Sequence, residues 1–526
     1  MLTFLTFIAF ISFVAIYSWL KLRKEKLDSQ DGYFLGGRSL TGVVIAGSML
    51  LTNISTEHLI GMNGSSYKNG FIIIGWEVTS ALALVAAAIF FVPMYLKMGL
   101  TTIPQFLEKR FDNATRTMVA FFLMISFVVT LLPIVLYTGA INLESIFNIS
   151  EVLEISKSKG IWITVMGIGI IGSIYAIFGG LKAVAISDTI NGYGLLIGGL
   201  AIPLMALASI GQGNPLDGLI KVFENSPEKF NVIGAKGSVM PFEVLFTGLI
   251  INQIYFWSMN QTIIQRALGA KNLIEAQKGL LFTGVLKILV PVIIILPGVI
   301  GFYFYGETFY DKQDMIYPEL IKRVLPAGLV GLFAAVVMGA VLSTFNSVLN
   351  SAATIFSIDI YKRHLGVNSS DKKLVWVGKL ASTILAIFAI IVAPMVANAP
   401  DGLYQLLQQL NGIFFIPIAS IILAGFFLKR VSAMGAKVAL ISGLAFYIIT
   451  IFILKVDLHF IHIWGIEFLI NILIMFVVSH FYPIKKEFKI ENLKIVDLRE
   501  WKYTKHMSVI LCLVTILIYI LLGKNS

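Results

Sequence analysis

Long apolar segments follow one another along the whole chain and are separated by short polar loops. A helix that crosses a membrane needs about 20 consecutive, mostly apolar residues. By that rule about 14 spans are predicted, centred near residues 10, 50, 83, 127, 168, 196, 250, 290, 340, 385, 416, 445, 470 and 515. The longest polar insert, at about 210–238, is rich in Gly, Pro and Asn and too short for a soluble domain. The pattern predicts an all-α membrane protein with a single transmembrane domain over residues 1–526.

Composition supports the membrane class and limits the partners. Of the 526 residues, 57% are hydrophobic and 13% are charged, whereas soluble proteins carry about 25% charged residues. The formal net charge is +11, but the basic residues lie in short loops, so membrane lipid is the expected surrounding and no nucleic-acid partner is expected. The single cysteine, Cys512, excludes a disulfide framework. The first span, Met1–Leu20, has neither a basic start nor a cleavage site and is predicted to be retained.

The distribution of basic residues predicts the orientation in the membrane. Cytoplasmic loops carry an excess of Lys and Arg. Most of the 40 Lys and Arg residues fall on one side of the membrane when the sequence KLRKEK, after the first span, is cytoplasmic. An even number of spans then leaves both termini outside. The predicted location is the cell membrane (plasma or bacterial inner membrane), crossed many times.

Two of the predicted spans are interrupted by polar residues. The second span reads GVVIAGSMLLTNISTEHLIGMNG, with a polar centre from Thr52 to His58. Five helices later, LIINQIYFWSMNQTIIQRAL carries amide side chains at Asn252, Gln253 and Asn260. Polar breaks in corresponding helices of two halves are typical of inverted-repeat transporters, whose broken helices line the binding site. The alternative is that these side chains only hold helices together by hydrogen bonds.

A carboxylate and an ammonium group are predicted in the membrane interior. Glu77 and Ser80 share a helix face beside Trp76, and a carboxylate beside an aromatic ring suits a sugar. Lys287 lies about 13 Å along its helix from Lys278, near mid-membrane, where it needs a partner such as Glu77. The alternatives are a position of Glu77 at the membrane boundary and a purely structural ion pair.

A stripe of hydroxyl residues predicts a site for a hard cation. Ser343, Ser347 and Ser351 recur every four residues, with Thr344 adjoining. Sodium prefers oxygen ligands, and these hydroxyls facing the broken second span would provide them. Close helix packing is the alternative. Asp188 is a further intramembrane carboxylate for a cation or a gate, and the Gln408 amide offers a donor and an acceptor to a hydroxylated solute.

With these residues the chain resembles the sodium/solute symporter family, especially bacterial sodium/galactose and animal sodium/glucose cotransporters. The resemblance rests on DGYFLGGRSL, NISTEHLIGM, TTIPQFLEKRF, IFGGLKAVAISD, NQTIIQRALGAKNLIEAQKG, LKILVPVIIILPG and LNSAATIFSIDIYKR. It implies a LeuT-type fold of five-plus-five inverted repeats, residues 38–209 and 239–430. One extra helix and a cytoplasmic loop (1–37) precede the repeats, and three extra helices (431–526) follow them.

The resemblance also implies the residues of two sites. The substrate-binding residues would be Asn53, His58, Trp76, Glu77, Ser80, Gln253, Phe256, Trp257, Lys287 and Gln408. Sodium would be held by the backbone carbonyls of Leu51, Ile54 and Ala340 and the hydroxyls of Ser343 and Thr344, with Asp188 and Ser347 matching a second sodium site of some members. The chain departs from the family's pattern at Trp76, Gln253 and Phe256, which alter the pocket, and at Asn346, near the second sodium site.

The predicted function is a sodium-coupled symporter that imports a glucose- or galactose-like monosaccharide by alternating access. The alternatives are another solute within the family, such as myo-inositol, sialic acid or an amino-acid-like solute, and coupling to protons. An enzyme or a channel is not expected, because the sequence has neither a catalytic constellation nor a filter-like loop. No cofactor is expected besides the coupling sodium ion, and the expected state is a monomer or a weak oligomer.

Overall fold

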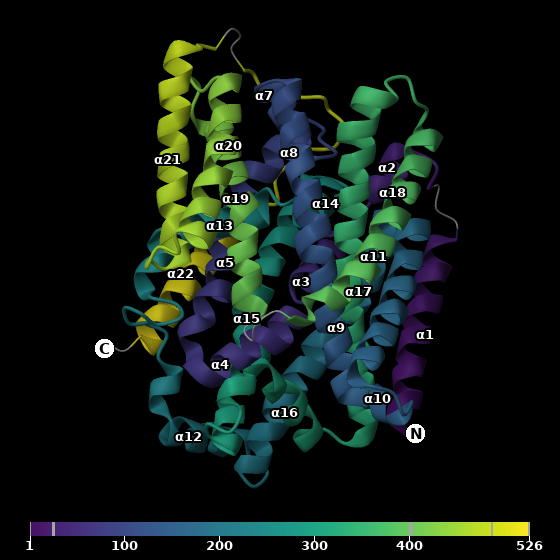
Figure 1. The fold of residues 1–526 in the computed structure, drawn as a ribbon, viewed down its shortest axis with the longest axis vertical. Coiled ribbons are helices and arrows are strands. Elements are labelled where there is room, and N and C mark those ends of the chain that lie inside the picture. Colours follow the sequence, from purple (N-terminus) through teal and green to yellow (C-terminus); the bar gives the residue numbers. More distant parts are fainter. Residues whose placement is uncertain (1, 24–26, 399–402, 485–487, 524–526) are drawn as a thin grey trace.

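The computed structural model describes residues 2–23, 27–398, 403–484 and 488–523. Within these ranges the chain is a bundle of helices without strands, apart from one isolated bridge between Leu40 and Ala270 (Figure 1). Eleven helical stretches of the described residues are long and apolar enough to cross a membrane. The all-helical membrane class is therefore confirmed. The count of 14 spans and the division into two repeats stay predictions.

The helices fall into two groups along the sequence. Up to residue 225 the main helical segments are α1 (Leu2–Leu22), α2 (Gln30–Phe34), α3 (Gly42–Asn53), the π-helical η2 (Glu57–Met62), α4 (Asn63–Asn69), α5 (Gly75–Ala86), α6 (Val92–Lys97), α7 (Ile103–Arg110), α8 (Asn113–Ile125), α9 (Leu132–Phe147), α10 (Ile149–Val152), α11 (Lys157–Ile210) and α12 (Pro215–Asn225). Beyond it they are α13 (Gly248–Ser258), α14 (Gln261–Leu268), α15 (Leu273–Tyr305), α16 (Ile316–Val324), α17 (Ala327–Ile355), η9 (Phe356–Leu365), α18 (Asp371–Val392), α19 (Leu403–Phe427), α20 (Ala433–Ile448), α21 (Phe460–Phe481) and α22 (Thr504–Leu522).

Two of the predicted spans, near residues 168 and 196, follow each other within α11 and are separated by a kink. The kink is at Gly180, whose φ of 57° and ψ of −164° are accessible to glycine and strained for other residues. A Cβ atom at this position would lie 2.5 Å from the carbonyl oxygen of Tyr33. The Tyr33 hydroxyl donates to the carbonyls of Ala176 and Ile177 at 3.1 and 3.0 Å, which holds the turn before the kink.

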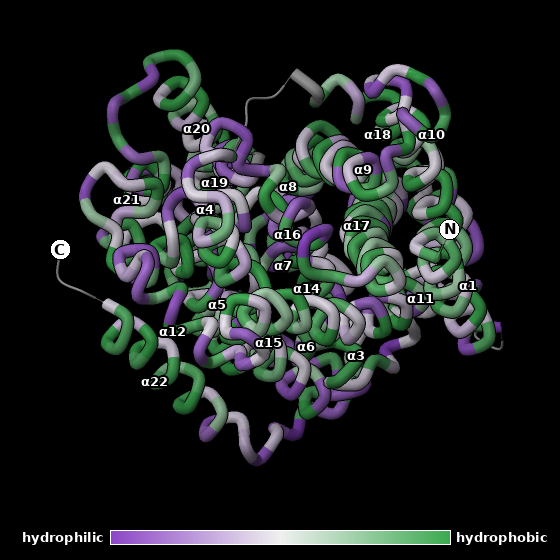
Figure 2. Tube along the Cα trace, turned by 90° about the horizontal axis from the view of Figure 1, so that it is seen from below, coloured by the Kyte–Doolittle hydropathy of each residue, from purple (hydrophilic) through white to green (hydrophobic). Residues whose placement is uncertain are grey.

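The burial of the helices separates a core from a lipid-facing shell. In α17 and its continuation, 78% of the most apolar window is buried, compared with 11% in α1 and 17% in α22. Seen along the helices in Figure 2, α1 and α22 lie at opposite sides of the bundle. Large apolar side chains such as Trp19 on α1 and Ile520 on α22 are exposed there. These helices face lipid, whereas α17 lies where the other helices converge.

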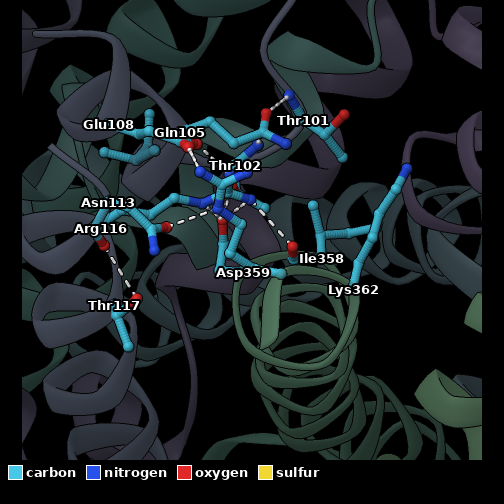
Figure 3. A network of polar contacts seen from close by, with 12 residues as sticks. Thr101, Thr102, Gln105, Glu108, Asn113, Arg116, Thr117, Ile358, Asp359 and Lys362 are labelled. Carbon is cyan, nitrogen blue, oxygen red and sulfur yellow. Dashed lines mark hydrogen bonds and ion pairs between the residues drawn. The ribbon is translucent and has the colours of Figure 1, made fainter. Parts of the chain in front are cut away.

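A network of charged side chains ties the helices together at the end of the bundle that carries α7, which is the predicted cytoplasmic end (Figures 1 and 3). The Arg116 guanidinium on α8 donates to Asp359 Oδ1 on η9 at 2.7 Å and also pairs with Glu108 on α7. Thr102, which caps α7, donates to the same Asp359 oxygen at 2.9 Å. Because Asp359 is fully buried, these donors offset the cost of removing its charge from water.

The chain between α21 and α22 runs back across this same end. Its backbone N–H at Leu493 donates to Lys97 O at 3.0 Å, and its carbonyl at Asp497 accepts from Leu273 N at 2.9 Å. The N–H of Trp501 donates to the Gln277 side chain at 2.8 Å. This segment joins the end of α6 to the start of α15. It brings α22 against α5 and α15, the helices that carry the ion pair described below.

The kink in α11 leads to a stability prediction. Gly180→Ala should lower the melting temperature of the purified protein by several degrees, because it combines a positive φ with a clash against the Tyr33 carbonyl. Gly167→Ala in the same helix is the matched control, since a Cβ atom at Gly167 meets nothing within 4 Å. Thermal unfolding in detergent compares the two variants. Equal melting temperatures would contradict the assignment of the kink to Gly180.

Candidate binding site at two helix breaks

The first predicted break is present in the second span. Helix α3 ends at Asn53, and Ile54 is extended, with φ −85° and ψ 100°. The chain becomes helical again at Thr56 and continues through η2 and α4. Carbonyl groups in the last turn of a helix have no partner within it. One of them, Thr52 O, accepts a hydrogen bond from Thr344 Oγ1 of α17 at 3.1 Å.

The second predicted break separates α13 from α14. Helix α13 ends at Ser258, and α14 begins two residues after Met259. The Asn260 side chain caps α14 by accepting from the N–H and the hydroxyl of Thr262 at 3.0 and 2.8 Å. Such a cap satisfies a helix end that has no water around it. Both polar interruptions seen in the sequence are therefore confirmed as helix breaks.

The predicted partnership of Lys287 and Glu77 is confirmed. Lys287 on α15 and Glu77 on α5 are both 1% exposed and form an ion pair. Lys287 Nζ also donates to Asn53 Oδ1 at 2.7 Å and lies 5.5 Å from the centre of the Trp257 ring. The ammonium group thus connects the end of α3 with α5 and α13. The carboxylate of Glu77 is thus buried within the helix bundle.

One cavity brings together all ten residues of the predicted substrate site. Its volume is about 70 Å³, room for several water molecules at about 10–15 Å³ each. A solute of hexose size therefore requires the surrounding side chains to move apart. The predicted residues that line the cavity are Asn53, His58, Trp76, Glu77, Ser80, Gln253, Phe256, Trp257, Lys287 and Gln408.

Gln253 organises one wall of the cavity. Its amide nitrogen donates to the carbonyl of Trp76 at 2.8 Å. Its oxygen accepts from the Ser80 hydroxyl at 3.0 Å and from the Trp257 indole at 3.2 Å. The longer side chain at this position, noted as a departure from the family's pattern, therefore joins α13 to α5. A solute hydroxyl that reached Ser80 or Trp257 would exchange with these internal hydrogen bonds.

An aromatic residue that sequence reasoning missed covers another part of the cavity. The ring of Tyr404 lies edge-on to His58 at 5.3 Å and to Trp76 at 5.8 Å, measured between ring centres. It lines the cavity together with Gln408, four residues further along α19. Residues four apart share a helix face, so the spacing from Gln408 was the signal that could have found Tyr404.

The residues of the predicted sodium site converge beside the first break. The Thr344 hydroxyl lies 3.1 Å from Thr52 O and 3.3 Å from Ala340 O. Ser343 is buried and faces the carboxylate of Asp188. Leu51 belongs to the last turn of α3 and Ile54 to the break itself, where carbonyls are freed from the helix. The chemistry of this set, hydroxyl and carbonyl oxygens, fits a hard monovalent cation.

The neighbourhood of the predicted second sodium site contains a guanidinium group. Arg266 of α14 is fully buried, with Nη2 3.7 Å from Asp188 Oδ2. It donates to the hydroxyl of Ser347, which lies 3.1 Å from Thr52 Oγ1. Ser48 Oγ also donates to Asp188 at 2.7 Å. Sequence reasoning missed Arg266, although an arginine so close to a polar break is an intramembrane charge that needs a partner.

An all-helical membrane protein with a buried polar cavity between two broken helices has the architecture of a secondary transporter. Residues 33–443 match the model of the Sodium:solute symporter family. The chain belongs to the sodium:solute symporter family. It is a membrane transport protein and not an enzyme.

Comparisons with individual proteins agree with this assignment. The chain is 45% identical to the uncharacterized symporter YidK of Escherichia coli, over 94% of this chain and 86% of the relative. It is 33% identical to the sodium/glucose cotransporter of Vibrio parahaemolyticus, over 81% and 80% of the two chains. The structure of a substrate-bound, outward-open sodium-coupled sialic acid symporter has the same fold, with a TM-score of 0.78 at 19% identity over 93% of this chain and 99% of that one.

The buried ion pair leads to a second stability prediction. Glu77→Gln leaves the Lys287 ammonium without its carboxylate, and breaking a buried pair in this way costs about 3–5 kcal/mol. Adding Lys287→Met should recover most of the lost stability, because no unpaired charge then remains. Neither the single nor the double variant should transport solute. Melting temperatures of the single and double variants in detergent check this.

The half-exposed pair of Glu319 and Lys322 on α16, 3.5 Å apart, provides the control. Glu319→Gln should change stability by at most about 1 kcal/mol, as is usual for exposed pairs. A double variant at positions 77 and 287 that is no more stable than Glu77→Gln alone would contradict the role given to the pair.

Proposed function

We propose that this symporter imports a glucose- or galactose-like monosaccharide together with sodium, by alternating access. The observation that carries the proposal is the group of Lys287, Glu77 and Asn53 in a cavity beside the ring of Trp257. A carboxylate accepts hydrogen bonds from sugar hydroxyls, an amide both accepts and donates them, and an aromatic ring covers the apolar C–H face of a sugar. The 33% identity to a sodium/glucose cotransporter supports the same solute class.

The proposed site residues follow the sequence prediction. The ten cavity residues named above would contact the sugar. Leu51, Ile54, Ala340, Ser343 and Thr344 would hold the coupling sodium. Asp188 and Ser347 stay candidates for a second sodium site. A second sodium ion would have to share these two residues with Arg266, which contacts both.

The proposed cycle couples the two solutes through the second span. Sodium favours the outward-open state, the sugar binds at mid-membrane, both sides close, and the inner side opens near Phe256. Coupling requires sodium to bind the two states unequally, and the effect is reciprocal. One charge crossing 100 mV contributes about 2.3 kcal/mol and a tenfold sodium gradient about 1.4 kcal/mol, so one sodium ion supports roughly 500-fold accumulation.

The orientation and the coupling ion complete the proposal. Both termini would lie outside, with the α7 end of the bundle in the cytoplasm, as the distribution of Lys and Arg predicts. Sodium is favoured over protons as the coupling ion because its predicted ligands are hydroxyls and carbonyls, which do not titrate in the physiological range. Another solute, such as myo-inositol, sialic acid or an amino-acid-like solute, is the alternative at the same site.

Counterflow in proteoliposomes tests the substrate class. The purified protein, preloaded with one sugar at a time from a panel of hexoses and polyols, should exchange labelled sugar for at least one of them, and only when sodium is present. Empty liposomes measure leakage. If no sugar or polyol moves, the substrate class is wrong. Sodium-independent uptake that follows pH would contradict sodium coupling.

A variant of the predicted sodium cage tests the ion site. Ser343→Ala removes one oxygen ligand and should raise the sodium concentration for half-maximal uptake about tenfold, the effect of losing about 1.4 kcal/mol of ion binding. Ser382→Ala on α18 is the control, because it removes another buried hydroxyl that makes no hydrogen bond. Titration of uptake against sodium at constant ionic strength provides the measurement. An unchanged sodium dependence would remove Ser343 from the site.

A further inference from the structure

The cavity contains a second carboxylate, Glu57, to which neither predicted site assigns a role. Glu57 is the first residue of η2, directly after the break, and is only 6% exposed. It lines the same cavity as Glu77. The Ser55 hydroxyl donates to one of its oxygens, and the other oxygen lies 3.7 Å from His58 Nδ1. Glu57 is therefore a buried acid held by a neutral hydroxyl and an imidazole, and no lysine or arginine of the described residues forms an ion pair with it.

Every basic group of the cavity already faces a carboxylate. Lys287 is the only lysine or arginine among the described residues that line the cavity, and it is paired with Glu77. Each ring nitrogen of His58 lies near a different carboxylate: Nε2 is 3.9 Å from a Glu77 oxygen, and Nδ1 is 3.7 Å from a Glu57 oxygen. A solute carboxylate that entered the cavity would find no unpaired cation.

The position of Glu57 makes an anionic solute still less favourable. A buried charge is tolerated when an opposite charge or several hydrogen-bond donors face it. A solute carboxylate in this cavity would lie near two acids, and like charges in one buried site repel each other strongly. A neutral hydroxyl, in contrast, can donate to the same Glu57 oxygen. The arrangement thus separates solutes by charge as well as by shape.

We propose that Glu57 excludes anionic solutes from the cavity, so that the transported sugar or polyol carries no carboxylate. Glu57, more than Glu77, sets this selectivity, since the charge of Glu77 is balanced by Lys287. The inference rests on the proposed function and narrows its solute class. It removes anionic solutes such as sialic acid from the alternatives and favours hexoses and neutral polyols such as myo-inositol.

The test compares two solutes that differ in charge and hardly in shape. D-glucuronate and D-glucuronamide, and the corresponding galactose derivatives, compete for sodium-driven uptake of the neutral sugar that counterflow identifies. In the wild type the amide should compete at least about tenfold better than the acid. Glu57→Gln should bring this ratio close to one, whereas Glu57→Asp, which keeps the charge, should retain it. Glu319→Gln on α16 is the control and should leave the ratio unchanged.

The ratio is measured within one preparation, so it does not depend on how much of a variant folds. If the acid and the amide compete equally in the wild type, the inference is wrong while the proposed function stands. A tenfold preference that persists in Glu57→Gln removes Glu57 from the selectivity. If instead the acids are transported and no neutral sugar is, the proposed monosaccharide and the inference are both wrong. Absence of any sugar or polyol counterflow contradicts the proposed function itself. Because counterflow is measured with neutral solutes, this outcome does not depend on the comparison of acid and amide.

Discussion

A helix that ends in the interior of a membrane protein leaves carbonyl groups without partners in the helix, and the site depends on how the protein satisfies them. Helix α3 ends at Asn53, deep in the bundle. The hydroxyl of Thr344 supplies a donor to the freed Thr52 carbonyl, and Lys287 reaches the Asn53 side chain. Helices α17 and α15 therefore both approach the break closely. The proposed ion and sugar contacts lie where these partners converge.

This arrangement gives a physical basis for coupling. The carbonyl of Thr52 faces the proposed sodium cage, and the next residue, Asn53, faces the sugar cavity through Lys287. An ion that draws carbonyl oxygens toward itself changes the position of the end of α3, and Asn53 with it. The ion pair of Lys287 and Glu77 carries that change to α5. Such a connection is required for sodium and solute to influence each other's affinity by the same factor.

The sequence predicted the interior of this site better than its surroundings. The break at Ile54 and the pair of Lys287 and Glu77 could be predicted because polar groups in apolar helices are costly and therefore conspicuous. The full set of ten cavity residues, which includes Phe256 and Trp257, followed from the family resemblance. Tyr404 was missed although its spacing of four residues from Gln408 places both on one helix face, and its packing against His58 shows its place in the cavity. Arg266 was missed although it is an intramembrane charge beside the second break and needs a partner as Lys287 does; Asp188 provides that partner. Charge counting in loops also gives no information on the segment that joins α21 to α22, which is held by hydrogen bonds and by aromatic contacts such as that of Trp501 with Phe282.

The closure of the predicted cytoplasmic end follows from α14, the helix after the second break. Gln265 donates to Phe34 O at 2.7 Å and to Thr354 Oγ1 at 2.9 Å, and it accepts from Ser351 at 2.8 Å. All three hydrogen bonds are buried, and leaving a buried polar group unsatisfied costs about 1–3 kcal/mol. Movement of α14 away from α17 therefore avoids this cost only when water enters and replaces the hydrogen-bond partners of Gln265. In the proposed cycle, opening of this end would therefore be coupled to its hydration.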